Sequence, residues 1–255
     1  MGRTMAQLQD KIAIVTGGAA GFGEAIVRLY VQQGARVVIA DLAEDKGQTL
    51  VRELGADKAC FVACDVADGA AVRHLVQSCV SAFGTPDIVV NNAGTTHANQ
   101  PMLQVDEATY DRMFNVNVKS IFHMAHAVVP LMRERGAGVI LNVGSTAGLR
   151  PRPGLTWYNA SKGAVNLLSK SMAVELGPDG IRVNAICPVI GETALLEKFM
   201  GVPDTPENRA KFIATIPLGR LSRPADVANA ALFLASDAAE FISGVEFPVD
   251  GGRTV

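Results

Sequence analysis

Cysteine and aromatic residues are scarce in this chain, and the placing of the few cysteines argues against two kinds of protein. Only 5% of the 255 residues are aromatic, and four are cysteines. These are Cys60, Cys64, Cys79 and Cys187, which form no Cys-x-x-Cys pair and have no histidines at ligand spacing beside them. A zinc site or a disulfide framework is therefore not expected. We expect buried free thiols and no metal.

Charge of one sign and long apolar runs are also lacking. The 23 basic and 25 acidic residues give a formal net charge of -2, and the basic residues are scattered rather than gathered in a cationic stripe. No apolar run approaches the length needed to cross a bilayer, and residues 1–10 lack the apolar stretch of a signal peptide. We expect a cytoplasmic protein that binds neither nucleic acid nor membrane, with residues 1–10 as a frayed N-terminal arm.

Short apolar runs alternate with helical patterns along most of the chain. The runs are continuous in apolar character, as strands covered on both faces require. We expect strands at residues 12–16, 36–40, 59–63, 88–91, 138–143 and 181–186. We expect helices at residues 22–33, 44–54, 69–83, 106–135 and 157–176, and a further helix that opens at Pro224.

Repeated strand-helix-strand units predict an α/β fold. Such units form a doubly wound parallel sheet of the Rossmann type, with helices on both faces and ligands at the carboxyl ends of the strands. No linker divides residues 1–255, so we expect a single domain. Four prolines and two short helical stretches interrupt the chain after residue 188, and we expect residues 189–220 to form a mobile lid over the substrate.

A glycine-rich turn, Thr16-Gly17-Gly18-Ala19-Ala20-Gly21-Phe22-Gly23, follows the first expected strand. Bare backbone there can approach a pyrophosphate, and the next helix offers its N-terminal N–H groups. The spacing departs from the commoner Gly-x-Gly-x-x-Gly fingerprint, and tight packing alone is the alternative interpretation. The turn indicates a phosphate cradle.

Asp41 ends the second expected strand, close to where an acidic residue accepts hydrogen bonds from the ribose hydroxyls of a dinucleotide. A carboxylate at this place repels a 2′-phosphate, and no Arg or Lys occupies residues 18–22 or 42 to compensate. The sequence therefore favours NAD over NADP. The alternative is that Asp41 only caps the next helix.

Two hydroxyls and one amine follow the fifth expected strand. Tyr158 and Lys162 are four residues apart and share a helix face, so an ammonium can lie near a phenol and favour its ionised form. Ser145 closes the strand before them, where its hydroxyl can hold a substrate oxygen. A Tyr-x-x-x-Lys pair alone is often only a surface pair, so the added serine matters.

Taken together, these motifs resemble a known family. Residues 16–23, the run Asn91-Asn92-Ala93-Gly94, Asn117, Ser145 and Tyr158-x-x-x-Lys162 resemble, in order and spacing, the short-chain dehydrogenase/reductases. The resemblance spans nearly the whole chain, from Lys11 to Gly252. It implies the compact single-domain branch of that family, with the Thr-Gly-x-x-x-Gly-x-Gly and Tyr-x-x-x-Lys motifs.

The resemblance implies a role for each catalytic group. Tyr158 is expected to be the general acid/base, Ser145 to orient the reacting oxygen, and Lys162 to lower the pKa of the tyrosine while holding the nicotinamide ribose. Asn117 is expected to lie in a distorted helix and hold a water that relays protons from Lys162. Asn115 is the competing asparagine, and we expect it to bond to backbone instead.

The resemblance also implies the contacts to the cofactor. Asp65 is expected to fix the adenine amino group beside Val66, and residues 184–193 to form a nicotinamide loop. Val189 stands where glycine is usual, so the path of that loop stays open. The expected NAD-binding residues are Gly17, Gly21, Phe22, Gly23, Asp41, Leu42, Asp65, Val66, Asn92, Ala93, Gly94, Tyr158, Lys162, Pro188 and Thr193.

The substrate end of the site is less defined by the sequence. Ser145, Thr96, Arg152 and Trp157 are our candidates for substrate contacts, and Arg150 and Arg152 make an anionic head group conceivable. We expect an NAD-dependent enzyme that interconverts a small secondary alcohol, such as a polyol or sugar, and its ketone. A 3-oxoacyl-thioester reductase is the alternative, and a non-catalytic NAD-sensing or scaffold protein is a further one.

We also expect a homotetramer. The expected helices at 106–135 and 157–176 carry more apolar surface than one sheet face can cover. That surplus is attributed to Phe122, Met124, Ala125, Val128, Val165, Leu168 and Met172.

Overall fold

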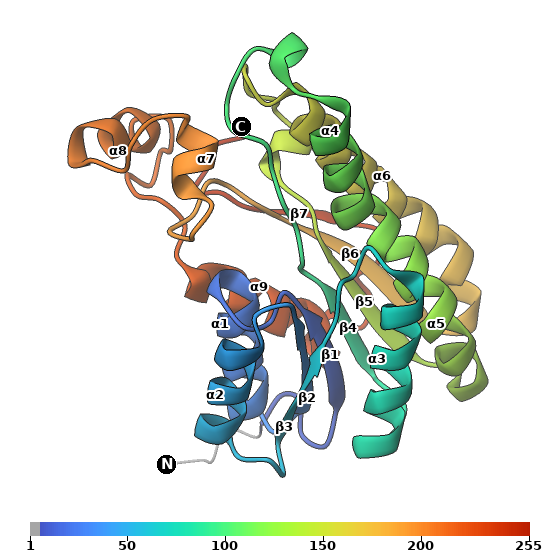
Figure 1. The fold of residues 1–255 in the computed structure, drawn as a ribbon. Coiled ribbons are helices and arrows are strands. Elements are labelled where there is room, and N and C mark those ends of the chain that lie inside the picture. Colours follow the sequence, from blue (N-terminus) through green and yellow to red (C-terminus); the bar gives the residue numbers. More distant parts are fainter. Residues whose placement is uncertain (1–5) are drawn as a thin grey trace.

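The computed structural model describes residues 6–255 and contains one parallel sheet of seven strands (Figure 1). The strands lie side by side in the order β3-β2-β1-β4-β5-β6-β7. Their bounds are β1 Ile12–Thr16, β2 Arg36–Asp41, β3 Ala59–Ala63, β4 Ile88–Asn91, β5 Gly138–Val143, β6 Ile181–Pro188 and β7 Glu246–Val249. The predicted doubly wound parallel sheet is confirmed.

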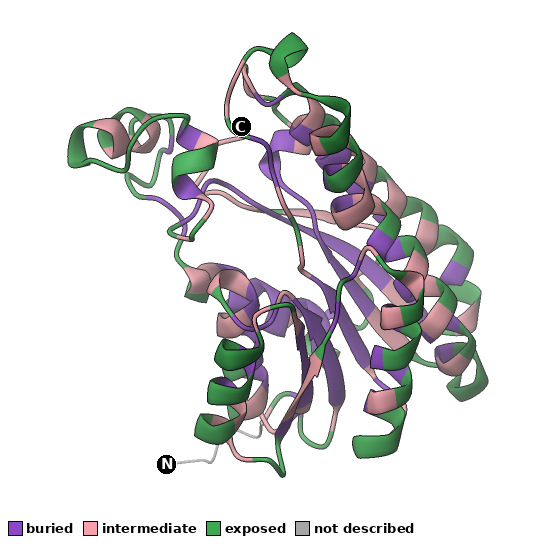
Figure 2. Ribbon diagram, in the orientation of Figure 1, coloured by how far each residue is buried: buried purple, intermediate pink, exposed green. Residues whose placement is uncertain are grey.

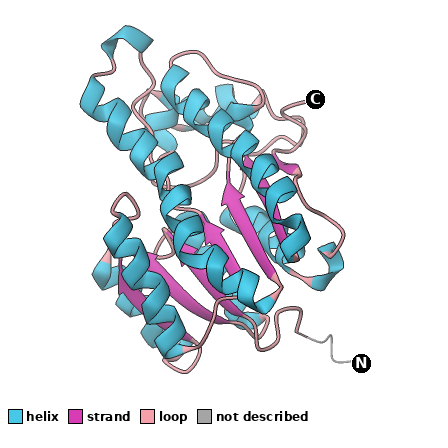
Figure 3. Ribbon diagram, turned by 90° about the vertical axis from the view of Figure 1, so that its right-hand side faces the viewer, coloured by secondary structure: helices cyan, strands magenta, loops and turns pink. Residues whose placement is uncertain are grey.

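Helices cover both faces of this sheet, as Figures 1 and 3 show. On one face lie α1 (Gly21–Gln32), α2 (Glu44–Leu54) and α9 (Pro224–Ala235). On the other lie α3 (Gly69–Ala82), α5 (Ser120–Arg135) and α6 (Thr156–Leu176), while α4 (Glu107–Phe114) precedes α5. Because both faces are covered, the central strands are apolar at nearly every position, which explains their continuous hydrophobic runs.

The hydrophobic core consists of two layers, one on each side of the sheet (Figure 2). In one layer Tyr30 of α1 is fully buried and its hydroxyl donates to the carbonyl of Ala231 in α9 at 3.0 Å. In the other, α3, α5 and α6 contribute Leu75, Val128 and Leu176. Val128, Met124 and Val165, which we expected at an assembly surface, are therefore core residues and do not contribute to such a surface.

The chain reverses its direction of travel across the sheet between β1 and β4, and this is where a crevice opens in folds of this kind. The Thr16 hydroxyl at the end of β1 accepts hydrogen bonds from the backbone N–H groups of Asn92 and Ala93, both at 3.0 Å. Asn92 in turn donates through Nδ2 to the carbonyls of Thr16 and Gly17, at 2.9 and 3.0 Å. The two strand ends are thus held in one rigid junction beside the crevice.

Two elements differ from the sequence predictions. We expected one helix over residues 106–135 with a distortion at Asn117, and a π-helical stretch, Asn115–Lys119, divides it into α4 and α5. The edge strand β7 was not predicted, because it has only four residues and includes Pro248, which cannot donate to a neighbouring strand. It pairs with the end of β6, where Ala185 to Pro188 lie opposite it.

The expected N-terminal arm and the expected lid both contain residues with regular structure or buried side chains. Residues 6–10 are not frayed, because the Leu8 side chain is fully buried and its N–H donates to the carbonyl of Gln33 at 3.0 Å. The rest of the expected arm, residues 1–5, lies outside the described residues. The segment 189–220 contains α7 (Leu196–Met200) and α8 (Pro206–Ile213), which stand over the carboxyl ends of the strands (Figure 1).

No helix in residues 6–255 is both long and apolar enough to span a bilayer. Within the same range, no three His, Cys, Asp or Glu side chains are grouped so as to hold a metal ion. All four cysteines are free thiols, and Cys64, Cys79 and Cys187 are buried.

Candidate active site

The glycine-rich turn after β1 is shaped by residues that lack a side chain. Gly17 and Gly21 have φ angles of 60° and 57°, in the left-handed region that L side chains rarely adopt. A Cβ on Gly23 would collide with the carbonyl oxygen of Gly17 and lie 2.6 Å from Nδ2 of Asn92. The turn can therefore close tightly under the first residues of α1, and Gly21 and Phe22 at the start of that helix line the cavity, where a helix N-terminus suits a pyrophosphate.

The Asp41 carboxylate bonds to two segments of backbone. One oxygen accepts from Ala19 N–H in the glycine-rich turn and the other from Ala43 N–H at the start of α2, each at 3.0 Å. No side chain caps α2, since the bond from Asp41 reaches only the N–H of the N-cap residue Ala43. The carboxylate is instead held beside the glycine-rich turn. Leu42 is exposed, Asp65 is exposed with its carboxylate accepting from Ala67 N–H, and Val66 is buried.

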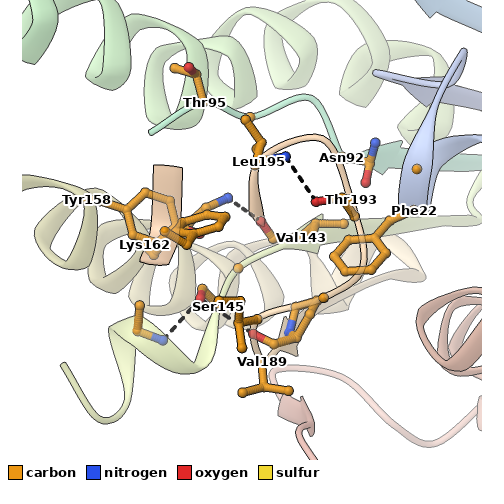
Figure 4. Close-up of a pocket in the computed structure, with 18 of the residues that line it drawn as sticks. Phe22, Asn92, Thr95, Val143, Ser145, Tyr158, Lys162, Val189, Thr193 and Leu195 are labelled. Atoms are coloured by element: carbon orange, nitrogen blue, oxygen red, sulfur yellow. Dashed lines mark hydrogen bonds between the residues drawn. The ribbon is translucent and has the colours of Figure 1, made fainter. Parts of the chain in front are cut away.

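Ser145, Tyr158 and Lys162 meet at the carboxyl end of β5 and are all buried (Figure 4). The Ser145 oxygen accepts from Ala147 N–H at 3.0 Å, which fixes its position at the start of a helical turn. Lys162 Nζ donates to the carbonyl of Val143 at 2.7 Å, so the ammonium is anchored to the last residue of the strand. Tyr158 is held on the same face of α6, one turn before Lys162.

The electrostatics of these groups differ from the expectation. Burial raises the pKa of Tyr158 to about 12, while the Ser145 hydroxyl and then the Arg152 charge act to lower it. Burial also lowers the pKa of Lys162 to about 8. We expected Lys162 to depress the pKa of Tyr158, but in the protein itself desolvation dominates and favours the neutral phenol and the neutral amine.

The π-helical stretch brings Asn117 into this site. Asn117 is buried, accepts from Thr95 N–H at 2.8 Å, and donates to Thr95 O and Ser161 Oγ, both at 3.0 Å. A Cβ on Gly94 would lie 3.4 Å from Asn117 Oδ1 and 3.5 Å from Lys162 Nζ, so both groups border the same small space. The choice of Asn117 over Asn115 agrees with this geometry. Ser161, which sequence reasoning missed, helps to hold it.

The loop after β6 makes its tightest backbone approach at Gly191 and not at Val189, the position where glycine is usual. Val189 continues the strand direction, donating through its N–H to Val249 O at 3.1 Å. The close approach falls instead at Gly191, where a Cβ would lie 2.5 Å from the Phe22 ring and 2.7 Å from Ser222 Oγ. Thr193 then lies over the glycine-rich turn, since a Cβ on Gly21 would be 3.5 Å from its methyl group. The Thr193 hydroxyl accepts from Leu195 N–H at 3.4 Å (Figure 4).

These groups surround one cavity of about 280 Å³. Of the expected site residues, it is lined by Gly17, Gly21, Phe22, Asn92, Ala93, Gly94, Ser145, Arg152, Tyr158, Lys162, Pro188 and Thr193. The glycine-rich turn and the buried hydroxyls therefore open onto the same space, and the residues present fit a dinucleotide laid from one to the other. Gly23, Asp41, Leu42, Asp65, Val66 and Asn117 lie outside its lining.

Comparison with known proteins identifies the family. Residues 17–254 match the family model described as enoyl-(acyl carrier protein) reductase. The chain belongs to the short-chain dehydrogenase/reductase family. This short-chain dehydrogenase/reductase is 49% identical to 4-formylbenzenesulfonate dehydrogenase of Comamonas testosteroni, over 97% of this chain and 99% of the relative. It is 37% identical to cyclopentanol dehydrogenase of Comamonas sp., over 98% of this chain and 99% of the relative.

A solved structure agrees with the architecture. The crystal structure of a 3-ketoacyl-(acyl-carrier-protein) reductase from Brucella melitensis, complexed with NADH, superimposes with a TM-score of 0.92 at 43% identity. The alignment covers 97% of this chain and 100% of that one. The predictions of an oxidoreductase acting on CH–OH groups and of a nicotinamide dinucleotide cofactor are confirmed at the level of the family.

At the substrate end, the structure separates the candidates. Arg152 lines the cavity, but Trp157 faces the outside of the site, where its indole N–H donates to Met102 O at 3.1 Å. Thr96 is buried, donates to the carbonyl of His97, and does not line the cavity. Neither Thr96 nor Trp157 lines the cavity, and their contact with substrate stays a prediction. The walls that sequence reasoning missed are apolar and come from Leu155, Ala147, Ile190, Leu195 and Phe199.

The collision at Gly23 yields a test of the cradle. We expect Gly23→Ala to displace the turn and to weaken NADH binding by roughly 10- to 100-fold, as forced overpacking of a tight contact does. The control is Gly177→Ala, because a Cβ at Gly177 meets no heavy atom within 4 Å. Fluorescence titration measures affinity and circular dichroism verifies folding. Unchanged affinity in a folded Gly23→Ala protein would refute the assignment.

Proposed function

We propose that the protein is an NAD-dependent dehydrogenase that interconverts a secondary alcohol and its ketone, with Tyr158 as the acid/base. The observation that carries this proposal is the single cavity lined by the glycine-rich turn at one end and by Ser145, Tyr158 and Lys162 at the other. The relatives named as dehydrogenases of an aromatic sulfonate and of cyclopentanol support the alcohol or carbonyl chemistry.

The reaction follows from the placing of the two hydroxyls. When oxidised nicotinamide is bound, it accepts the hydride that leaves the alcohol carbon. Ser145, fixed by Ala147 N–H, holds the alcohol oxygen, and Tyr158 in its phenolate form takes the proton from that oxygen. In the direction of reduction the neutral phenol of Tyr158 returns the proton. Its buried position excludes water from this exchange.

Lys162 and Asn117 complete a path for that proton. The carbonyl of Val143 holds Lys162 Nζ beside the site, and the lowered pKa of this amine, about 8, lets it gain and lose a proton near neutral pH. Asn117 borders the same space near Gly94 and is fixed by three hydrogen bonds. We assign Lys162 as the group that passes protons to and from Tyr158, and Asn117 as the residue that positions a water behind it.

Removal of the phenol tests the mechanism. We expect Tyr158→Phe to lower kcat for alcohol oxidation by about 10²- to 10⁴-fold, since the proton acceptor is lost while the ring remains. NAD affinity should change little, because the glycine-rich turn is untouched. In the unaltered protein the oxidation rate should rise with pH, since the raised pKa of Tyr158 leaves little phenolate at neutral pH. The variant should lose that rise.

Tyr110→Phe is the matched control for this test. Tyr110 packs against Phe114 and Trp157 and does not line the cavity, so its variant should retain normal turnover. Steady-state kinetics from pH 6 to 10 with NAD measures both variants. Near-normal turnover by Tyr158→Phe would rule out Tyr158 as the acid/base.

The preference for NAD over NADP rests on charge near the adenosine end of the turn. The Asp41 carboxylate is held against Ala19 N–H, and residues 18–22 contain no basic side chain. Arg28 lies near this turn, but it is engaged by Glu24 at 2.8 Å and Glu53 at 2.7 Å. A 2′-phosphate brought to this place would meet the Asp41 carboxylate, and of the cations that line the groove beside the turn Arg28 is paired while Lys46 lies beside Asp45 on α2.

Two substitutions at Asp41 separate charge from hydrogen bonding. Asp41→Asn keeps acceptor atoms for Ala19 or Ala43 N–H but removes the charge, and we expect it to narrow the NAD over NADP preference in kcat/KM by roughly tenfold, about 1.4 kcal/mol. Asp41→Ala should narrow the preference as well, with added loss of NAD affinity because both backbone bonds disappear. Equal use of both cofactors by the unaltered protein would contradict the proposal.

The acyl-reductase alternative is favoured by one observation, the high structural similarity to the Brucella 3-ketoacyl reductase. It predicts turnover of 3-oxoacyl thioesters in preference to small ketones. The non-catalytic alternative has less support, because the whole set of Asn117, Ser145, Tyr158 and Lys162 is present and buried.

We also propose that residues 189–220 close over the substrate, since Ala194, Leu195 and Phe199 of this segment line the cavity.

We propose that the protein is a cytoplasmic homotetramer that assembles through α5 and α6. Phe122 on α5 is 56% exposed, and Leu167 and Val174 on α6 are 65% and 82% exposed. Light scattering coupled to size exclusion should give the mass of four chains at micromolar concentration, and Phe122→Asp with Val174→Asp should reduce it. A monomeric mass for the unaltered protein would overturn this proposal.

A further inference from the structure

Arg152 lies where three parts of the molecule meet. It belongs to the loop between β5 and α6 and lines the active-site cavity together with Tyr158. It also lines an adjoining groove with Arg253 from the C-terminal segment and Lys211 from α8. Its guanidinium carbon lies 5.4 Å from the centre of the Phe212 ring, on the same lid helix. The groove therefore joins the active-site cavity through Arg152.

Of the three cations at this junction, Lys211 pairs with Glu207 at 3.5 Å, whereas Arg152 and Arg253 lack a carboxylate partner in the described part of the chain. None of the ion pairs formed by residues 6–255 includes Arg152 or Arg253. The nearby Asp250 carboxylate is occupied by the N–H groups of Gly252 and Thr254 and by the Thr254 hydroxyl. Burial lowers the pKa of Arg152, and the charge of Arg253 lowers it further.

The Arg253 guanidinium also lacks a hydrogen-bond acceptor for one of its donors among the described residues. Its Nε atom is buried and has no hydrogen-bond partner. A buried donor of a charged group is costly to leave unpaired, and two guanidinium groups close together repel each other. An anionic group between them would remove both costs. Arg150 does not share this role, because its guanidinium donates to the carbonyl of Arg253 at 2.9 Å.

Between this charge and the catalytic phenol the cavity is apolar. Leu155, Leu195 and Phe199 form its walls, and the Phe199 ring lies 5.0 Å from the Tyr158 ring at an angle of 64°. Such walls suit a flat apolar body, and aromatic edges favour another ring. The cavity thus combines a proton acceptor, an apolar aromatic wall and a cation in one lining.

We infer that Arg152 and Arg253 form a subsite for the anionic group of an aromatic substrate whose alcohol or carbonyl carbon lies at Tyr158. The group is a carboxylate or a sulfonate, whose oxygens match the two-pronged geometry of guanidinium donors. The inference rests on the proposed function, because it assigns the substrate class of that same site. Arg152 is a specificity residue in this scheme and exchanges no proton itself, although its charge acts to lower the pKa of Tyr158.

Two alcohols of the same shape test the subsite. These are 4-(1-hydroxyethyl)benzoate and 1-(4-methylphenyl)ethanol, in which a methyl group replaces the carboxylate. We expect kcat/KM with NAD to be at least tenfold higher for the benzoate. Arg152→Leu should lower kcat/KM for the benzoate about 10- to 100-fold more than for the neutral alcohol, mainly through KM, because the loss of its effect on the pKa of Tyr158 acts on both alcohols alike. Arg253→Leu should act in the same direction.

Lys198→Leu is the matched control, since it removes one positive charge from an exposed position of α7 that lines neither the cavity nor the groove. It should leave both alcohols unaffected. If Arg152→Leu slowed both alcohols equally, Arg152 would serve only to hold Phe212 and the lid, and the subsite would be wrong. Equal turnover of the two alcohols by the unaltered protein would also overturn it, while leaving the proposed dehydrogenase intact.

A binding measurement separates the subsite from the reaction. Calorimetric titration of the protein with NADH present should show 4-acetylbenzoate binding at least tenfold more tightly than 4-methylacetophenone, and Arg152→Leu should abolish the difference. Equal affinity for the two ketones refutes the subsite. Selective binding without turnover of either alcohol supports the subsite and refutes the proposed oxidation instead.

Discussion

The junction between the carboxyl ends of β1 and β4 is the constraint on which the site depends. Adjacent strands whose crossovers run in opposite directions leave a crevice between their carboxyl ends. Here the Thr16 hydroxyl accepts from two backbone N–H groups after β4, and the Asn92 amide donates to two carbonyls at the end of β1, so the separation of the two strand ends is fixed. The glycine-rich turn is held to β4 by the same bonds. A dinucleotide therefore meets a formed surface and need not order a loop, which lowers the entropic cost of binding.

A second polar network connects the catalytic helix to the sheet. Asn91 donates to Asn142 at 2.8 Å, and Asn142 donates to Ser169 of α6 at 3.0 Å, all three side chains being buried. A network with every member satisfied specifies one arrangement of the elements it joins. Since α6 also carries Tyr158 and Lys162, this arrangement sets their distance from Ser145, which lies two residues after the end of β5. The desolvation that raises the pKa of the phenol is a consequence of the same close packing.

Much of this architecture could be predicted from the sequence, and the exceptions have physical causes. Continuous apolar runs identified six strands, because central strands are covered on both faces. The strand β7 at the edge was missed, since its short sequence with Pro248 has no such pattern. Ser145, Tyr158 and Lys162 could be found from spacing along one strand and one helix. Phe199 and Leu155 could not, because they line the cavity from irregular segments whose positions depend on tertiary packing.

The contact of Gly191 with Phe22 links two segments that serve different ends of the site. A Cβ at position 191 would lie 2.5 Å from the Phe22 ring, so the base of the lid rests on the first turn of the helix behind the pyrophosphate cradle. A side chain at 191 would also lie 2.7 Å from Ser222 Oγ, so it requires both the Phe22 ring and the Ser222 hydroxyl to move or be replaced. The base of the lid and the cradle therefore constrain each other's sequence, while the lid beyond its base can diversify for new substrates.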